Sequence, residues 1–163
     1  MKIALYPGTF DPITNGHLDI LERAIRIFDE IVIALAKNPA KEPLFSLEER
    51  LEMVREAVDG MSGIKVVVLD GLAVEGARKH GAASLIRGLR AVSDFEFEFQ
   101  MALMNRHLAP ELSTVYLMPK DEYTYLSSSI IKGVARHGGD IDHFVPPGVK
   151  RRLLEKFAGE ETA

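Results

Sequence analysis

The segment 6–17, Tyr-Pro-Gly-Thr-Phe-Asp-Pro-Ile-Thr-Asn-Gly-His, combines residue types that could hold a phosphate group. It follows a short apolar run, and His17 stands where a helix is expected to begin. A helix N-terminus presents unpaired N–H groups and the positive end of the helix dipole, and both attract anions. The same dipole end disfavours an imidazolium. We therefore expect a neutral His17 that donates a hydrogen bond to a phosphoryl oxygen, and Gly8 and Gly16 would let the backbone approach that ligand closely.

Three further groups suited to phosphate follow later strands of the expected fold. Lys41 follows the second strand, Arg87 and Arg90 follow the fourth, and Ser127–Ser129 opens the helix after the fifth. The arginine fork matches phosphate oxygens, and serine hydroxyls with first-turn N–H groups can cradle a polyphosphate. Lys132, one turn further on, could support the same charge or face water. The chain has neither a Gly-Lys-Ser/Thr phosphate loop nor a Gly-x-Gly-x-x-Gly motif, so a nucleotide site would be of another type.

Strand-length apolar runs alternate with segments of helical period along the whole chain. We expect strands at 2–6, 31–36, 64–69, 84–86 and 114–118, and helices at 17–28, 47–58, 72–80, 94–108, 127–136 and 147–157. The strands are apolar without alternation, which favours a parallel sheet covered on both faces. The sequence therefore predicts a single α/β domain over 1–158, doubly wound and Rossmann-like with five parallel strands, and a frayed tail at 159–163. Such sheets bind ligands at the carboxyl ends of their strands.

The expected helix 94–108 is apolar on two sides. We expect Asp94 to cap it. One stripe consists of Phe95, Phe99, Ala102 and Leu103, and the other of Phe97, Met101 and Met104. A helix with two apolar stripes is buried on two sides. In a domain of this size, the second partner would be another subunit.

Composition excludes several classes of protein. The 163 residues include no cysteine, which removes disulfides, thiolate zinc sites and a cysteine nucleophile. The net charge of −4 disfavours a nucleic-acid binder. No apolar run approaches the ~20 residues of a membrane-spanning helix, and no signal-peptide pattern precedes the first strand. We therefore expect a cytoplasmic protein.

The motif Thr14-Asn15-Gly16-His17, following Gly8-Thr9-Phe10-Asp11-Pro12, resembles the (H/T)xGH signature of the nucleotidyltransferase superfamily. With threonine in its first position, the motif resembles that of the phosphopantetheine adenylyltransferase branch. The resemblance extends from Ile3 to about Phe157, through blocks in the same order: Asn38-Pro39-Ala40-Lys41, Ile86-Arg87-Gly88-Leu89-Arg90, Asp94-Phe95-Glu96-Phe97-Glu98, Met104-Asn105-Arg106-His107 and Leu126-Ser127-Ser128-Ser129. The chain departs from the pattern at Leu126, where isoleucine is usual, and at Ala73, where a larger apolar residue is common.

This resemblance implies transfer of the adenylyl group of ATP to 4'-phosphopantetheine, which gives dephospho-coenzyme A and pyrophosphate. It implies that the acceptor is bound by Thr9, Lys41, Ala73 and Arg87, and that His17 stabilises the transition state. It further implies that ATP is bound by Thr9, Phe10, His17, Gly88, Leu89, Arg90, Glu98, Tyr123, Thr124, Tyr125, Leu126, Ser127, Ser128 and Ser129. Mg²⁺ as cofactor and a homohexamer are also implied, with no protein residue assigned as a metal ligand.

The acceptor phosphate is already an anion near neutral pH and needs no general base. We therefore expect direct in-line attack without a covalent enzyme intermediate, with His17, Lys41 and Arg90 as the catalytic groups. Other readings remain open at this point. The acceptor could be glycerol phosphate, nicotinate mononucleotide or flavin mononucleotide. The domain could also be a nucleotide sensor without catalysis, or a fragment of a tRNA synthetase.

Overall fold

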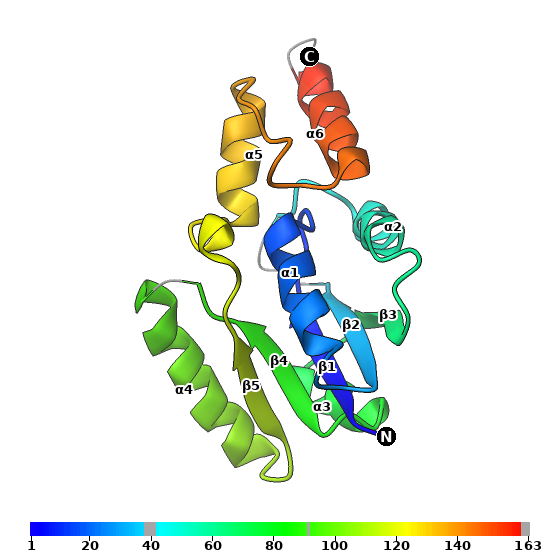
Figure 1. Cartoon of the computed structure of the whole chain (residues 1–163), viewed down its shortest axis with the longest axis vertical. Coiled ribbons are helices and arrows are strands. Elements are labelled where there is room, and N and C mark those ends of the chain that lie inside the picture. The colour runs from blue at the N-terminus through cyan, green and yellow to red at the C-terminus, as the bar shows by residue number, and fades with distance from the viewer. Residues whose placement is uncertain (38–41, 91, 161–163) are drawn as a thin grey trace.

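The computed structural model describes residues 1–37, 42–90 and 92–160 (Figure 1). Its centre is a five-stranded sheet in the order β3-β2-β1-β4-β5, in which every pairing is parallel. The strands are β1 Ile3–Gly8, β2 Glu30–Ala36, β3 Ile64–Leu69, β4 Ser84–Gly88 and β5 Ser113–Leu117. The predicted doubly wound sheet is therefore confirmed, and no strand end differs from the prediction by more than two residues.

All six predicted helices are present, with moved ends. They are α1 Asn15–Ala24, α2 Leu47–Ala57, α3 Ala73–Lys79, α4 Val92–Leu108, α5 Ser128–Arg136 and α6 Pro147–Glu160, together with a short 3₁₀ helix, η1 Asp121–Tyr123, that was not predicted. The helix α6 runs two residues into the tail predicted at 159–163, and residues 161–163 lie outside the described ranges. Within those ranges, no helix combines the length and the apolar character needed to cross a membrane.

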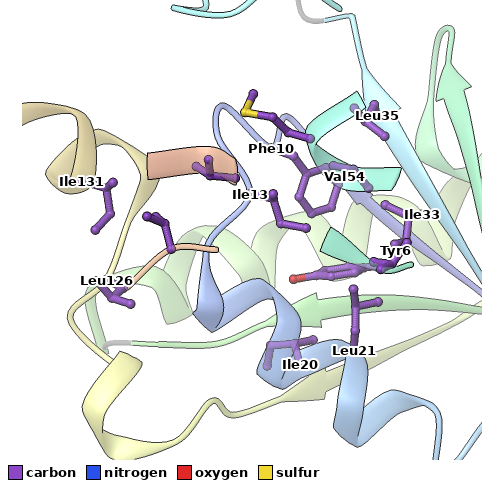
Figure 2. Close-up of a cluster of buried hydrophobic side chains, with 14 of the residues drawn as sticks. Tyr6, Phe10, Ile13, Ile20, Leu21, Ile33, Leu35, Val54, Leu126 and Ile131 are labelled. Carbon is purple, nitrogen blue, oxygen red and sulfur yellow. The ribbon is translucent and has the colours of Figure 1, made fainter. Parts of the chain in front are cut away.

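Alternate residues of the central strands enter two separate cores. On β1, Tyr6 packs into the core beneath α1 and α2, whereas its neighbour Leu5 packs into the core beneath α3. Figure 1 shows α1 in front of the sheet and α3 behind it. The first core is drawn in Figure 2, where Leu21 of α1 and Val54 of α2 converge on Tyr6 and Ile33. Apolar side chains on both faces are what a doubly covered parallel sheet requires.

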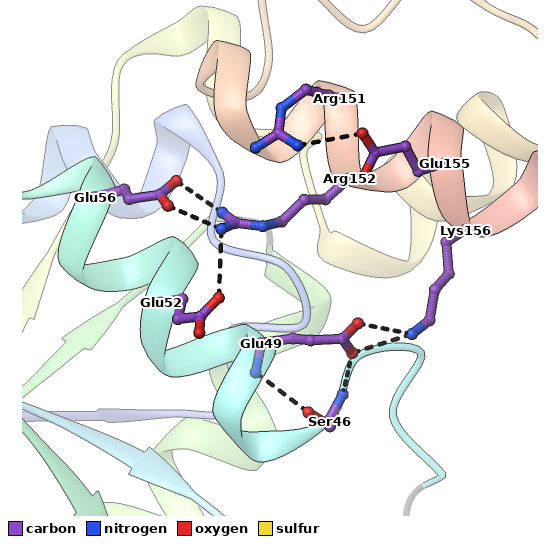
Figure 3. A network of polar contacts seen from close by, with 8 residues as sticks. All are labelled: Ser46, Glu49, Glu52, Glu56, Arg151, Arg152, Glu155 and Lys156. Carbon is purple, nitrogen blue, oxygen red and sulfur yellow. Dashed lines mark hydrogen bonds and ion pairs between the residues drawn. The ribbon is translucent and has the colours of Figure 1, made fainter.

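The helices α5 and α6 lie beyond the carboxyl ends of the strands (Figure 1). Ion pairs hold α6 against α2, as Figure 3 shows. Arg152 contacts both carboxylate oxygens of Glu56 at 2.7 and 2.8 Å and reaches Glu52 at 3.4 Å. Lys156 donates to Glu49 at 2.9 Å. These contacts fix the elements that surround one end of the sheet.

The arrangement of α4 differs from the prediction. Its two apolar stripes do not face a core within this chain; their large side chains are exposed: Phe95, Phe97, Phe99, Met101, Leu103 and Met104. The face turned inward carries Glu98 and Asn105 together with Ala102, the small member of the first stripe. Asp94 does not cap the helix, because α4 begins at Val92 and places Asp94 in its first turn. The exposed stripes therefore remain available to another molecule.

Candidate active site

A cleft of about 830 Å³ opens at the carboxyl ends of β1 and β4. These two strands are neighbours where the order of the sheet reverses, which is where doubly wound folds bind ligands. The loop after β1, the first turn of α1, the end of β4, the helix α4 and the start of α5 contribute to its wall. Residues far apart in sequence thus meet at one site, as the sequence predicts.

The loop after β1 is tightly packed. A Cβ atom at Gly8 would lie 2.8 Å from Cε2 of Phe10, a distance that side chains do not tolerate without a shift. Phe10 has a φ angle of 47°, a left-handed conformation that costs a non-glycine residue of the order of 1–3 kcal/mol. Its ring is held between Tyr6 and His17, with centroids 5.4 and 5.1 Å away. Packing therefore fixes the conformation of the loop after β1, which contributes to the wall of the cleft.

Asp11, which sequence reasoning missed as a site residue, ties three segments together. Its buried carboxylate accepts hydrogen bonds from the backbone N–H groups of Leu44 and Phe45 at 2.9 and 3.0 Å, and from Lys132 Nζ at 2.6 Å. Its position in the loop between β1 and α1, within the segment predicted to hold a phosphate, is the signal that could have identified it. Asp11 also settles the orientation of Lys132, which lines the cleft.

Arg50 of α2 is a second residue that was missed. Its side chain is 1% exposed, and Nη1 donates to the carbonyl oxygens of Thr9 at 2.7 Å and Ala36 at 3.0 Å. It therefore fixes the spacing between the chain segments that leave β1 and β2. Arg50 lies one turn before Met53 and Val54 on the buried face of the helix. A charged residue on an apolar helical face was the available signal.

The tautomer of His17 follows from its hydrogen bonds. Thr14 caps α1, and its backbone N–H donates to Nδ1 of His17 at 3.0 Å. Nδ1 is therefore an acceptor, which leaves the proton on Nε2. Burial and, to a smaller extent, the nearby positive charge of Arg90 lower the pKa of His17 to about 4. The imidazole is neutral at pH 7, in agreement with the expectation, and can donate through Nε2–H.

Two helix N-termini add backbone donors to the cleft. In the first turns of α1 and α5, the N–H groups of Gly16, Ser128 and Ser129 have no partner within the described residues, and all three residues line the cleft. The hydroxyls are more committed: Ser127 Oγ accepts from the N–H of Ile130 at 3.1 Å, and Ser128 Oγ donates to the carbonyl of Pro12 at 2.8 Å. The first-turn N–H groups are thus available to an anion, whereas the O–H of Ser128 is already donated to Pro12.

Two arginines face the same space, each paired with a carboxylate of α4. Arg87 contacts Glu98 through Nε at 2.9 Å and Nη2 at 2.5 Å, and this hydrogen bonding raises the pKa of Arg87. Arg90 contacts Asp94 at 3.3 Å and donates to the carbonyl of Leu126 at the start of α5. With Lys132, three cationic side chains converge on one cleft.

Most of the predicted site residues line this cleft. They are Thr9, Phe10, His17, Arg87, Gly88, Arg90, Glu98, Tyr123, Leu126, Ser127, Ser128 and Ser129. Other lining residues are Gly8, Gly16 and Lys132, whose positions in the sequence already suggested a phosphate site, and Tyr6, Pro7, Asp11, Thr14, Ile20, Glu42, Pro43, Asp94, Phe97 and Pro119, which were not predicted. Several of these are apolar or fold-determining positions, which residue type alone does not mark as functional.

Four predicted residues do not line the cleft, and one lies outside the described ranges. Ala73 is in the first turn of α3 and packs against the core beneath that helix. Leu89 uses its N–H to bond the carbonyl of Leu117, Thr124 Oγ1 donates to Asp121, and Tyr125 is 60% exposed. Lys41 lies outside the described residues, so its predicted role remains a prediction.

Comparison with known proteins identifies the family. A family model described as cytidylyltransferase-like matches residues 5–134. Phosphopantetheine adenylyltransferases from Heliobacterium modesticaldum, Desulforudis audaxviator and Methylococcus capsulatus are 53%, 55% and 56% identical to this chain. Each alignment covers 96% of this chain and 94%, 96% and 96% of those proteins, respectively. The chain belongs to the phosphopantetheine adenylyltransferase family.

The fold of this family member is shared beyond its close relatives. A crystal structure of a proposed nicotinate-nucleotide adenylyltransferase from Vibrio parahaemolyticus superimposes with a TM-score of 0.70 at 17% identity. The superposition covers 94% of this chain and 99% of that one. The same doubly wound framework therefore persists at low sequence identity.

Proposed function

We propose that this protein transfers the adenylyl group of ATP to 4'-phosphopantetheine, giving dephospho-coenzyme A and pyrophosphate. Its relatives, at 53–56% identity over nearly the whole chain, are phosphopantetheine adenylyltransferases. The structural observation that carries the proposal is the neutral His17, whose Nε2–H shares a cleft with Arg87, Arg90 and Lys132. Such a set of donors suits the negative charge that accumulates on a phosphorus under attack.

The reaction is a single displacement. An oxygen of the acceptor phosphate forms a bond to the α-phosphorus of ATP, and the bond from that phosphorus to the β-bridging oxygen breaks as pyrophosphate leaves. His17 Nε2–H and the N-terminus of α1 stabilise the equatorial oxygens, and Lys41 is proposed to assist. Arg90 and the first-turn N–H groups of α5 hold the departing pyrophosphate, while Arg87 grips the acceptor. Positioning and charge stabilisation supply the catalysis.

A magnesium site built by the protein does not fit the described residues. They contain no cluster of three or more side chains of metal-ligating type. Three carboxylates at the cleft are each paired with a cation: Asp11 with Lys132, Asp94 with Arg90, and Glu98 with Arg87. Mg²⁺ in nucleotide sites takes many of its ligands from phosphates. We therefore propose that Mg²⁺ enters as a companion of ATP, and none of the steps above depends on it.

The exposed stripes of α4 support the predicted homohexamer as a proposal. Phe95, Phe99 and Leu103 are between 49% and 55% exposed, and Phe95 stacks on Phe99 with ring centroids 6.0 Å apart. Large contiguous apolar surfaces on soluble proteins mark contact sites. The cytoplasmic location is likewise part of the proposal.

The reaction is tested by incubating the protein with ATP, Mg²⁺ and 4'-phosphopantetheine and following dephospho-coenzyme A and pyrophosphate. Nicotinate mononucleotide, glycerol phosphate and flavin mononucleotide serve as competing acceptors. We expect turnover with 4'-phosphopantetheine, and inversion of configuration when the α-phosphorus is made chiral, because one displacement inverts it once. Preferred use of another acceptor would overturn the assignment. Retention of configuration, or an adenylyl-protein seen by intact mass, would overturn the direct mechanism.

His17→Ala tests the transition-state donor. Removing one preorganised donor from such a centre lowers kcat by ~10²–10³-fold. The Kd for ATP should change little, because Nε2–H acts chiefly on charge that develops during the reaction. Rapid-quench kinetics and equilibrium ATP binding measure the two quantities, with the exposed His107→Ala as control. Full activity in His17→Ala would remove this residue from the mechanism.

A further inference from the structure

Arg50 carries a positive charge into the interior beside the cleft, and no carboxylate of the described residues neutralises it. The residue is 1% exposed, and its Nε has no hydrogen-bond partner. Within residues 1–37, 42–90 and 92–160, its partners are two backbone carbonyl oxygens, that of Thr9 at 2.7 Å and that of Ala36 at 3.0 Å. An unpaired charge is costly in a protein interior. The position of Arg50 therefore indicates a role that a neutral core residue could not fill.

The carbonyl oxygen that Arg50 binds belongs to the peptide group between Thr9 and Phe10. This peptide is trans, so its C=O and its N–H point in opposite directions. Thr9 and Phe10 line the cleft, whereas Arg50 does not. Because Arg50 holds the carbonyl of Thr9 on the side away from the cleft, the N–H of Phe10 is turned toward the cleft.

The N–H of Phe10 lacks a partner in the part of the chain that the structure describes. Buried backbone N–H groups are almost always paired, and Phe10 is only 3% exposed. A ligand in the cleft is therefore the partner that this group requires. The Phe10 ring packs against the imidazole of His17, with centroids 5.1 Å apart, so the two donors belong to the same part of the site.

The conformation of Phe10 also depends on Arg50. A φ angle of 47° is unfavourable for phenylalanine, and rotation of the Thr9–Phe10 peptide plane by half a turn would make this angle negative. The same rotation would place the carbonyl oxygen of Thr9 in the cleft, where it would repel a phosphate. Hydrogen bonds from a charged donor are among the stronger ones in proteins. The bond from Arg50 to Thr9 therefore opposes the rotation.

We propose that Arg50 is a positioning residue: it holds the Thr9–Phe10 peptide so that the N–H of Phe10 donates to an oxygen on the α-phosphorus of ATP, beside Nε2 of His17. The inference rests on the proposed function, to which it adds one further donor and the residue that orients it. Arg50 touches neither substrate. Its charge, which the described carboxylates leave unpaired, favours an anion in the adjoining cleft.

The role of the Phe10 N–H can be observed directly, because the pair Thr-Phe occurs once in the sequence, at 9–10. Protein labelled with ¹³C at threonine carbonyls and with ¹⁵N at phenylalanine gives one signal in a carbonyl-edited amide NMR spectrum, that of Phe10. We expect saturating ATP with Mg²⁺, added without acceptor, to shift this amide proton downfield, since the N–H then binds a charged oxygen. An unmoved signal at saturation would overturn the inference.

Arg50→Met tests the positioning role, with Arg55→Met as the matched control on the exposed face of the same helix. Methionine is of similar length but has neither the charge nor the donors. We expect Arg50→Met to lower kcat by about 10-fold or more, since loss of a donor outright costs ~10²–10³-fold. The downfield shift of the Phe10 amide should be lost in Arg50→Met and retained in Arg55→Met.

The thermal midpoint reports whether Arg50→Met is folded. If it is not, Arg50→Lys replaces it, because lysine keeps the charge without the planar fork, and we expect smaller changes in the same directions. Unchanged kcat in the folded variant would overturn the inference, as would a lowered kcat with the amide shift intact, which a merely structural role predicts. Wild-type protein that turns over no acceptor would remove the proposed function and this inference together. Active wild-type protein in which ATP leaves the Phe10 signal unmoved would remove the inference alone.

Discussion

At the level of single residues, His17 shows how neighbours decide the chemistry of a side chain. Its Nδ1 accepts from the backbone of Thr14, burial and Arg90 lower its pKa to about 4, and the proton therefore stays on Nε2. The cap that begins α1 is thus also the device that orients the donor. Neither the tautomer nor the size of the pKa change can be read from a histidine in a motif.

The lowered pKa of His17 predicts an effect of pH on stability. The unfolded chain takes up a proton at this residue near pH 6.5, whereas the native protein does so only near pH 4. Because the unfolded state binds more protons between these values, the free energy of unfolding falls as the pH falls through this range. In urea denaturation, His17→Gln should lose less stability than the wild-type protein between pH 7 and pH 5. An equal loss in both proteins would contradict the lowered pKa.

At the level of elements, the position of α6 depends on charge. Arg152 bridges from α6 to Glu52 and Glu56 on α2, and its own side chain is only 16% exposed (Figure 3). The hydrogen bond from Arg152 lowers the pKa of Glu56 below its ordinary value of 4.5. The contribution of this pair is therefore complete above that value and is lost as the pH falls through the lowered pKa.

Arg152→Ala should lower the free energy of unfolding by about 1 kcal/mol at pH 7, near the upper end for surface ion pairs because the contact is bidentate. The loss should shrink in high salt, and also when the pH falls through the lowered pKa of Glu56, because the carboxylate is then protonated. Arg151→Ala is the matched control, since Arg151 pairs with Glu155 on its own helix. Urea denaturation measures both variants. Equal losses in the two would show that the bridge to α2 contributes nothing.

At the level of the whole molecule, the sheet and its ligand-binding edge could be predicted because they follow from local patterns. Continuous apolar strands such as Ile31–Ala36, and the capping box at Ser46 and Glu49, encode their structure within a few residues. The cleft then follows from the rule for parallel sheets. The strand order alone is enough to predict that cationic residues from separate loops lie close together at this edge of the sheet.

Other features depend on contacts between distant residues and could not be predicted. Asp11 and Lys132 are 121 residues apart, and their contact leaves no periodic trace in the sequence. The face of α4 that turns inward carries Glu98 rather than either apolar stripe, because what the helix covers is decided by tertiary packing and not by its own period. Sequence reasoning found that α4 has two apolar sides but could not tell that both point outward.

The proposed hexamer predicts that those outward stripes are contact surfaces between subunits. We expect the wild-type protein to be a hexamer in light scattering coupled to size exclusion. Leu103→Asp should yield a smaller species, because a charge placed in an apolar contact is left unpaired. Leu154→Asp, at an exposed position on α6, is the control and should leave the mass unchanged. A monomeric wild-type protein would contradict the proposed hexamer.

The crowding at Gly8 limits which residues the loop after β1 can accept at this position. A Cβ atom there would collide with the Phe10 ring, and Phe10 is itself confined by Tyr6 and His17. A small-molecule inhibitor that binds this stretch of backbone would contact main-chain atoms, and a substitution at Gly8 could hardly remove those contacts without disturbing the loop. The contacts least open to loss by mutation would therefore be those made to Gly8, a residue with no side chain.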